Sequence, residues 1–222
     1  MNGWFVTGTD TGVGKTFVTA LLLRGLAARG HRVIGLKPVA TGCRATPDGL
    51  RSEDAELLLA AGNVRAHYED SNPHAFAPPV APHLAAEAAG VRLDAETIAR
   101  LCRTVAARAN FTLVEGIGGW LVPLNETETV ADLARALALP VIVVVGLRLG
   151  CINHALLTCR AVRETGLPLA GWIANGMDPE LSQADQLIAA IEMRVDAPLL
   201  ARVPHRPPES FSLAGVLNRR EG

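Results

Sequence analysis

The stretch Gly8-Thr-Asp-Thr-Gly-Val-Gly-Lys-Thr16 follows a short apolar run at residues 4–7 and leads directly into a helical pattern. Glycines in such a turn let backbone N–H groups point inward, a helix N-terminus adds positive potential, and a lysine reaches the β- and γ-phosphates of a nucleotide. The strict pattern has a glycine where Thr9 stands, and Gly8 lies one place too early. The order of strand, loop and helix nevertheless predicts a phosphate-binding loop, with the Thr16 hydroxyl on Mg²⁺.

Beyond this loop, short apolar runs bounded by Gly or Pro alternate with longer amphipathic segments, which is typical of βα units around a mostly parallel sheet. We expect strands at residues 4–7, 32–37, 111–115, 141–145, 171–175 and 199–203. We expect helices at residues 15–29, 52–61, 94–109, 129–139, 152–164 and 182–193. The run at 140–146 is apolar throughout, which predicts a central strand with helices on both faces. The predicted fold class is therefore α/β.

The length of 222 residues favours one domain over the whole chain, residues 1–222. Apolar residues make up 49% and charged residues 19%, enough for a large core. With 21 Lys and Arg against 22 Asp and Glu and no long basic run, the sequence predicts small-molecule partners, and neither nucleic acid nor a membrane.

The sequence also carries expectations about location and about irregular segments. We see no secretory signal, and the longest apolar run, residues 140–147, is too short to span a membrane, so we expect a cytoplasmic protein. The four cysteines form no C-x-x-C pair and are expected to be small buried hydrophobic residues. Four prolines within residues 68–83 predict a surface crossover loop.

Three further residues stand where strands end or helices begin. Glu115 follows an apolar strand and precedes a glycine run, which predicts a Mg²⁺ ligand at the carboxyl edge of the sheet, the alternative being a helix cap. Lys37 ends the second strand and would face the ligand crevice, or else be an ordinary solvated lysine. Asp54, in the first turn of a helix, could also reach the cation, but acidic residues are common at that position, so by itself the sequence favours a structural role.

Together these stretches resemble the dethiobiotin synthetases. The resemblance rests on the loop, on Lys37-Pro-Val-Ala-Thr-Gly42, on Val114-Glu-Gly-Ile-Gly-Gly-Trp120 and on Gly150-Cys-Ile-Asn-His154, and it runs from residue 4 to about residue 204. It implies a P-loop NTPase-like fold and a ligase of biotin biosynthesis. The implied reaction is the ATP- and Mg²⁺-dependent ring closure of 7,8-diaminopelargonic acid with CO₂, through a carbamate and its anhydride with phosphate. It also implies a homodimer.

The resemblance implies site residues position by position. The implied catalytic residues are Lys37, Lys15 and Thr11, and the implied metal ligands are Thr16, Asp54 and Glu115. The implied nucleotide contacts are Gly12, Val13, Gly14, Lys15, Thr16, Asp54, Glu115, Gly116, Gly118, Asn175, Gly176 and Pro204. The implied substrate contacts are Lys37, Thr41, Gly150, Cys151, Ile152 and Asn153, the last four from the neighbouring subunit. Some family members have glutamate at the position of Gly12.

Three other functions deserve comparison with this one. A nucleotide-dependent dimerisation switch of the partitioning ATPase type usually has a second lysine early in the loop, and residues 8–14 contain none. An amidase-synthetase of the cobyrinate type needs a glutaminase domain, for which 222 residues leave no room. A small-molecule kinase would need a lid to exclude water, and no arginine-rich segment suggests one.

Overall fold

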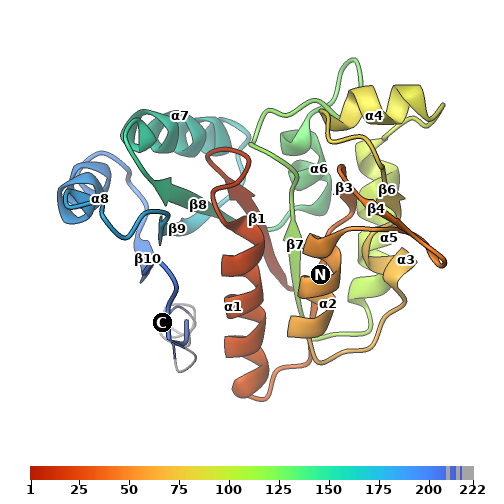
Figure 1. Cartoon of the computed structure of the whole chain (residues 1–222), viewed down its shortest axis with the longest axis horizontal. Coiled ribbons are helices and arrows are strands. Elements are labelled where there is room, and N and C mark those ends of the chain that lie inside the picture. The colour runs from red at the N-terminus through yellow and green to blue at the C-terminus, as the bar shows by residue number, and fades with distance from the viewer. Residues whose placement is uncertain (209–210, 214–215, 217–222) are drawn as a thin grey trace.

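A parallel sheet of six strands forms the centre of the protein. The computed structural model describes residues 1–208, 211–213 and 216. The strands are β1 (Gly3–Gly8), β2 (Val33–Leu36), β7 (Phe111–Glu115), β8 (Val141–Leu147), β9 (Leu169–Gly176) and β10 (Leu199–Val203). They lie in the order β10-β9-β8-β1-β7-β2, and every neighbouring pair is parallel (Figure 1). The predicted α/β class is confirmed.

Helices cover both faces of this sheet. The long helices are α1 (Lys15–Ala28), α2 (Glu53–Ala61), α5 (Ala95–Ala106), α6 (Val130–Leu137), α7 (Cys151–Glu164) and α8 (Ala184–Glu192). Apolar side chains of α1 and α2 share one core with Ile142 and Val144 of β8. Those of α5 to α8 share the other core with Val141, Val143 and Val145. Alternate residues of one strand thus face opposite layers. The predicted central position of β8 is confirmed.

Local signals in the sequence fix the start of two helices. The Ser52 side chain accepts a hydrogen bond from the Ala55 N–H at 3.4 Å, and Asp94 accepts one from the Thr97 N–H at 2.7 Å. Both residues are N-caps, of α2 and α5 respectively. Such caps satisfy N–H groups that the first helical turn leaves without a partner. The cap at Ser52 matters for function because it sets the position of Asp54 in the first turn of α2.

The prediction of a crossover loop over residues 68–83 is wrong for about half of that stretch. It contains α3 (Tyr68–Ser71), β6 (His74–Ala75) and the first residues of α4 (Pro82–Ala88). β6 pairs with the short strand β3 (Val39–Ala40), and a hairpin of β4 (Arg44–Thr46) and β5 (Gly49–Arg51) was also not expected. Elements of two to four residues are too short to show a periodicity. Of these elements, α3 is held by hydrogen bonds of Ser71 to Gly35 of β2 and to Lys37.

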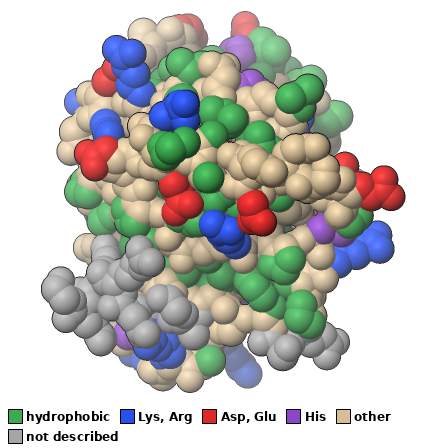
Figure 2. Space-filling model, turned by 90° about the vertical axis from the view of Figure 1, so that its left-hand side faces the viewer, with side chains coloured by type: hydrophobic (Ala, Val, Ile, Leu, Met, Phe, Trp, Pro, Cys, Tyr) green, Lys and Arg blue, Asp and Glu red, His purple; other side chains and the backbone are tan. Residues whose placement is uncertain are grey.

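Among the residues described, no helix has the length and apolarity needed to cross a membrane. On the face toward α8, acidic and basic side chains are interspersed (Figure 2). Arg202 pairs with both Asp185 and Glu192. All four cysteines are buried free thiols, which confirms their prediction as small buried residues. Burial raises the pKa of Cys102 to about 12.

Candidate active site

The carboxyl ends of the parallel strands bring the predicted residues to one edge of the sheet. The phosphate loop follows β1, Lys37 follows β2, and Glu115 ends β7, next to β1 in the sheet. Beside them lies a cavity of about 700 Å³. Its lining consists of Thr11, Gly12, Gly14, Lys15, Thr16, Lys37, Ala40, Thr41, Asp54, Pro79, Val80, Ala81, Pro82, Ile117, Gly118 and Val122. The structure therefore gathers the predicted catalytic residues and most of the predicted phosphate-loop residues and metal ligands around one space.

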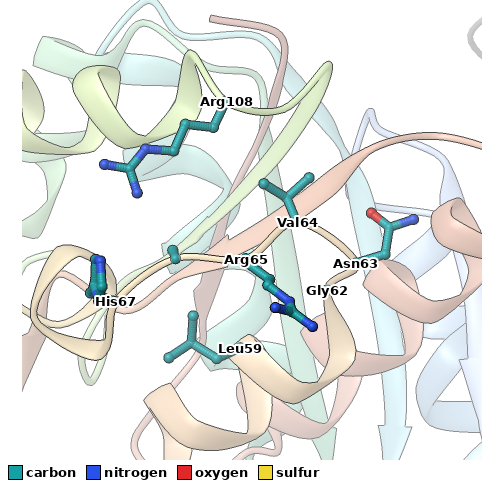
Figure 3. A pocket seen from close by; sticks show the side chains of 8 residues that line it. Leu59, Gly62, Asn63, Val64, Arg65, His67 and Arg108 are labelled. Carbon is teal, nitrogen blue, oxygen red and sulfur yellow. The ribbon is translucent and has the colours of Figure 1, made fainter.

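A second cavity of similar size, about 690 Å³, lies at the carboxyl end of α2 (Figure 3). It is lined by Leu59, Gly62, Asn63, Val64, Arg65, Ala66, His67 and Arg108. This lining contains no carboxylate and none of the predicted site residues. We therefore assign the chemistry to the cavity at the phosphate loop.

Lys37 is the electrostatic centre of that site. Its side chain is buried, and its Nζ lies 2.9 Å from Asp54 Oδ2, 2.6 Å from Glu115 Oε1 and 3.2 Å from the Gly116 carbonyl oxygen. Burial acts to lower the pKa of Lys37, but the charges of Glu115 and Asp54 raise it overall. Burial likewise acts to raise the pKa of Asp54, and Lys37 lowers it overall. Lys37 is therefore a permanently charged ammonium group held by two carboxylates.

The three predicted metal ligands surround the same point. The Thr16 hydroxyl donates to Glu115 Oε1 at 2.7 Å and also helps to lower the pKa of Asp54. Glu115 is fully buried, and its second oxygen, Oε2, has no hydrogen-bond partner among the described residues. A buried carboxylate oxygen without a donor is costly, and hard cations such as Mg²⁺ prefer carboxylate and hydroxyl oxygens. This donor set fits Mg²⁺.

Lys15 lies in the first turn of α1, beside the cavity. Its Nζ donates to the Asp10 carbonyl oxygen at 2.9 Å. Burial, assisted by the positive charge of Lys37, lowers the pKa of Lys15 to about 8. A partly desolvated ammonium next to a second one favours an anion between them. The two lysines thus prepare this end of the cavity for phosphate or carbamate oxygens.

The glycines of the loop differ in what surrounds them. Gly14 is the N-cap of α1 and has a φ of 86°, and a Cβ built there would lie 2.2 Å from Asn175 Nδ2. Gly12 also has a positive φ, 73°, but nothing lies within 4 Å of a Cβ built on it. The backbone conformation favours glycine at both positions. Only at Gly14 does close packing require it as well.

Three of the predicted nucleotide contacts, Asn175, Gly176 and Pro204, lie outside the cavity lining. Asn175 is buried at the end of β9, and its Nδ2 donates to the Val13 carbonyl oxygen at 2.9 Å. A Cβ on Gly176 would lie 2.8 Å from the His205 nitrogen and 3.3 Å from the Pro204 carbonyl carbon. Asn175, Gly176 and Pro204 are therefore neighbours at the ends of β9 and β10. In this structure the Asn175 amide supports the loop.

The substrate contacts predicted for the neighbouring subunit lie at the start of α7, outside the cavity lining. Gly150 is the N-cap, with Cys151, Ile152 and Asn153 in the first turn. Beside it, the exposed Arg148 donates to Asp10 Oδ2 at 2.6 Å, which ties this turn to the phosphate loop. The Thr11 N–H and then Arg148 lower the pKa of Asp10. Leu149, in the same turn, is 95% exposed.

Sequence reasoning missed the apolar wall of the cavity. Pro79, Val80, Ala81 and Pro82 form one side of it, with Ile117 and Val122 as further apolar residues. The prolines were visible in the sequence, but nothing in their spacing indicated that the segment turns toward the phosphate loop. An apolar wall beside charged groups suits a ligand with a hydrocarbon chain.

Comparison with known proteins agrees with this geometry. The family described as AAA domain matches residues 2–210. The chain is 51% identical to the ATP-dependent dethiobiotin synthetase of Nitrosospira multiformis, with 91% of this chain and 88% of that protein covered. It is 52% identical to the enzyme of the same name from Pseudomonas aeruginosa, with 92% and 90% covered.

Solved structures are similar in fold at much lower identity. The MinC:MinD cell division complex of Aquifex aeolicus matches with a TM-score of 0.64 and 16% identity, over 100% of this chain and 96% of that chain. MinD of Pyrococcus horikoshii, solved with Mg-ADP, matches with a TM-score of 0.56 and 18% identity, over 91% and 81%. These likenesses confirm the P-loop NTPase-like fold. The sequence relationships go further: the chain belongs to the AAA domain family and, within it, to the ATP-dependent dethiobiotin synthetases.

Proposed function

We propose that this enzyme closes the ureido ring of dethiobiotin from 7,8-diaminopelargonic acid, CO₂ and ATP. One amine adds to CO₂ and gives a carbamate. A carbamate oxygen then takes the γ-phosphoryl group as ADP leaves, and the second amine attacks the carbonyl carbon and expels phosphate. The observation that carries this proposal is the buried Lys37 ammonium, held between Asp54 and Glu115 beside a phosphate loop and an apolar wall.

The residues divide the work by charge and position. The loop from Gly12 to Thr16 and the Lys15 ammonium bind the phosphates through backbone N–H groups and positive charge. Lys37 stabilises the carbamate and the charge that develops on it during phosphoryl transfer. The hydroxyls of Thr11 and Thr41, both in the cavity lining, orient the diamine or its carbamate. Asn175, Gly176, Pro204 and the glycines Gly116 and Gly118 complete the nucleotide site.

Mg²⁺ belongs to this proposal. Thr16, Asp54 and Glu115 would hold the ion, which neutralises charge on the β- and γ-phosphates when bound. The unpartnered Glu115 Oε2 supports this assignment. Two carboxylates and one hydroxyl leave positions for phosphate oxygens and water, as Mg²⁺ usually requires.

The proposal includes a homodimer. The N-terminus of α7, at Gly150, Cys151, Ile152 and Asn153, would bind the substrate carboxylate in the neighbouring subunit's site, because a helix N-terminus attracts anions. We further propose that residues 1–222 act as one catalytic unit. We place this unit in the cytoplasm, where ATP is present and cysteines such as these free thiols stay reduced.

The release of ADP is expected to depend jointly on the diamine and on bicarbonate. With ATP and Mg²⁺ present, leaving out either compound removes the nucleophile that accepts the γ-phosphoryl group. The measurement is coupled ADP release in all four combinations, with dethiobiotin quantified by mass spectrometry. Equal ADP release without the diamine, together with ATP-driven dimerisation, would instead favour the partitioning-type switch.

A further inference from the structure

Lys37 and Asp54 come from different elements, the end of β2 and the first turn of α2, yet their side chains must meet at one point. A continuous chain of side-chain hydrogen bonds connects the backbones that carry them. We propose that Tyr68 and Asn72 are positioning residues that fix the position of Lys37 relative to Asp54. The inference rests on the proposed function, in which these two residues act together.

The chain of hydrogen bonds has three links. The N–H of Ser52, the N-cap of α2, donates to the Tyr68 hydroxyl at 2.6 Å. The Tyr68 hydroxyl donates to Asn72 Oδ1 at 2.7 Å, and Asn72 Nδ2 donates to the Lys37 carbonyl oxygen at 2.5 Å. One end of the chain thus lies two residues before Asp54, and the other lies on Lys37 itself.

The donor and acceptor at each link leave no alternative arrangement. The Ser52 N–H can only donate, so the Tyr68 hydroxyl oxygen accepts this hydrogen bond. The hydroxyl then donates its single proton to a hydrogen bond with Asn72. Asn72 must then present its oxygen to Tyr68 and its nitrogen to the Lys37 carbonyl, which can only accept. A network that defines the direction of every bond specifies one geometry rather than several.

Burial and ring contacts hold the two side chains in place. Asn72 is 3% exposed. The Arg51 guanidinium lies 4.2 Å from the centre of the Tyr68 ring, a cation–π contact, and pairs with Glu69 at 3.1 Å. Buried polar networks of this kind cost free energy unless all members are paired. Here the described bonds pair both ends of the Asn72 amide.

Attachment of α3 to the sheet does not require these two side chains. The Lys37 N–H donates to the Ser71 carbonyl oxygen at 3.0 Å, and the Ser71 hydroxyl donates to the Gly35 carbonyl oxygen at 3.0 Å. Those bonds already fix α3 against β2. The contribution specific to Tyr68 and Asn72 is the connection from Lys37 to the start of α2, which is the connection that the site needs.

The test uses the full-length enzyme with Tyr68→Phe and Asn72→Asp. Tyr68→Phe keeps the ring but removes the link, and Asn72→Asp places a carboxylate oxygen against the Lys37 carbonyl. We expect kcat for dethiobiotin formation to fall about tenfold and about a hundredfold respectively, with KM for ATP within about twofold, since small misplacements of reacting groups cost this much. The Asn63→Asp control changes an amide that bridges His31 and Val33 at the other end of β2, and its kcat should stay within about twofold.

A second measurement separates positioning from stability. In a Lys37→Gln background, Tyr68→Phe should leave the residual kcat unchanged, because the group that it positions is already gone. A general loss of stability would lower kcat in both backgrounds. It would also lower the kcat of the Asn63→Asp variant. A wild-type kcat for Tyr68→Phe, or an undiminished effect in the Lys37→Gln background, would overturn the inference. Failure of the wild-type enzyme to form dethiobiotin would instead refute the proposed function.

Discussion

Lys37→Gln is expected to lower kcat for dethiobiotin formation about a thousandfold, the upper range for loss of one group that stabilises developing charge. The amide has no charge to offer the carbamate or its anhydride, whereas the phosphate loop and Lys15 remain. The affinity for ADP should therefore change by less than about fivefold, which places the effect on turnover rather than on binding. Single-turnover kinetics together with calorimetric titration of ADP measures both quantities.

The same substitution should destabilise the protein when a chelator is present. Removing one partner of a buried ion pair costs about 3–5 kcal/mol, and we expect the lower end because the Asp54 side chain is 47% exposed. Urea unfolding in EDTA measures this loss. The control is Arg44→Met, which breaks an exposed ion pair with Glu56, a residue of the helix α2 that also carries Asp54. This variant should change neither kcat nor stability appreciably. Normal turnover by Lys37→Gln would remove Lys37 from the catalytic residues.

Gly14→Ala should abolish measurable nucleotide binding, with a loss of affinity of about a hundredfold or more. A positive φ alone costs an alanine about 1–2 kcal/mol. At Gly14 the new Cβ would also lie 2.2 Å from Asn175 Nδ2, so Asn175 must leave the Val13 carbonyl that it supports. The loop and the nucleobase side of the site are then disturbed together. Titration of the variant with Mg-ADP measures the effect.

Gly12→Ala is the matched control, because Gly12 has a similar φ of 73° and open space around a Cβ. It carries the conformational cost without the collision, so its affinity for Mg-ADP should fall by no more than about thirtyfold. The two variants together separate backbone strain from packing. Equal losses at both positions would show that Asn175 has no part in shaping the loop.

The sequence predicted the fold well because its signals are long or local. The apolar run of β8 indicated a central strand, and the caps at Ser52 and Asp94 marked where α2 and α5 begin. The prediction for residues 68–83 was partly wrong because the elements there are short and give no such signal. The four-residue helix α3 has no periodicity of its own, and it is held by the bonds of Ser71 to the Gly35 carbonyl oxygen of β2 and to the Lys37 N–H.

The site was predictable where residues follow strand ends. Lys37 and Glu115 end or follow β2 and β7, and parallel strands deliver their carboxyl ends to one edge. The assignment of Asp54 needed the family resemblance, since an acid in a first helical turn is commonplace. The apolar wall at Pro79 to Pro82 and the supporting bonds of Tyr68 and Asn72 depend on tertiary contacts, which a single sequence does not encode in any spacing.

The most direct test of the account follows an oxygen atom. If a carbamate is phosphorylated and the second amine then expels phosphate, one carbamate oxygen leaves with that phosphate. Turnover with ¹⁸O-labelled bicarbonate, started before the label exchanges with water, should give phosphate that carries one ¹⁸O for each dethiobiotin formed. The ureido oxygen should be labelled as well. Unlabelled phosphate alongside dethiobiotin would contradict the anhydride route and the role assigned to Lys37.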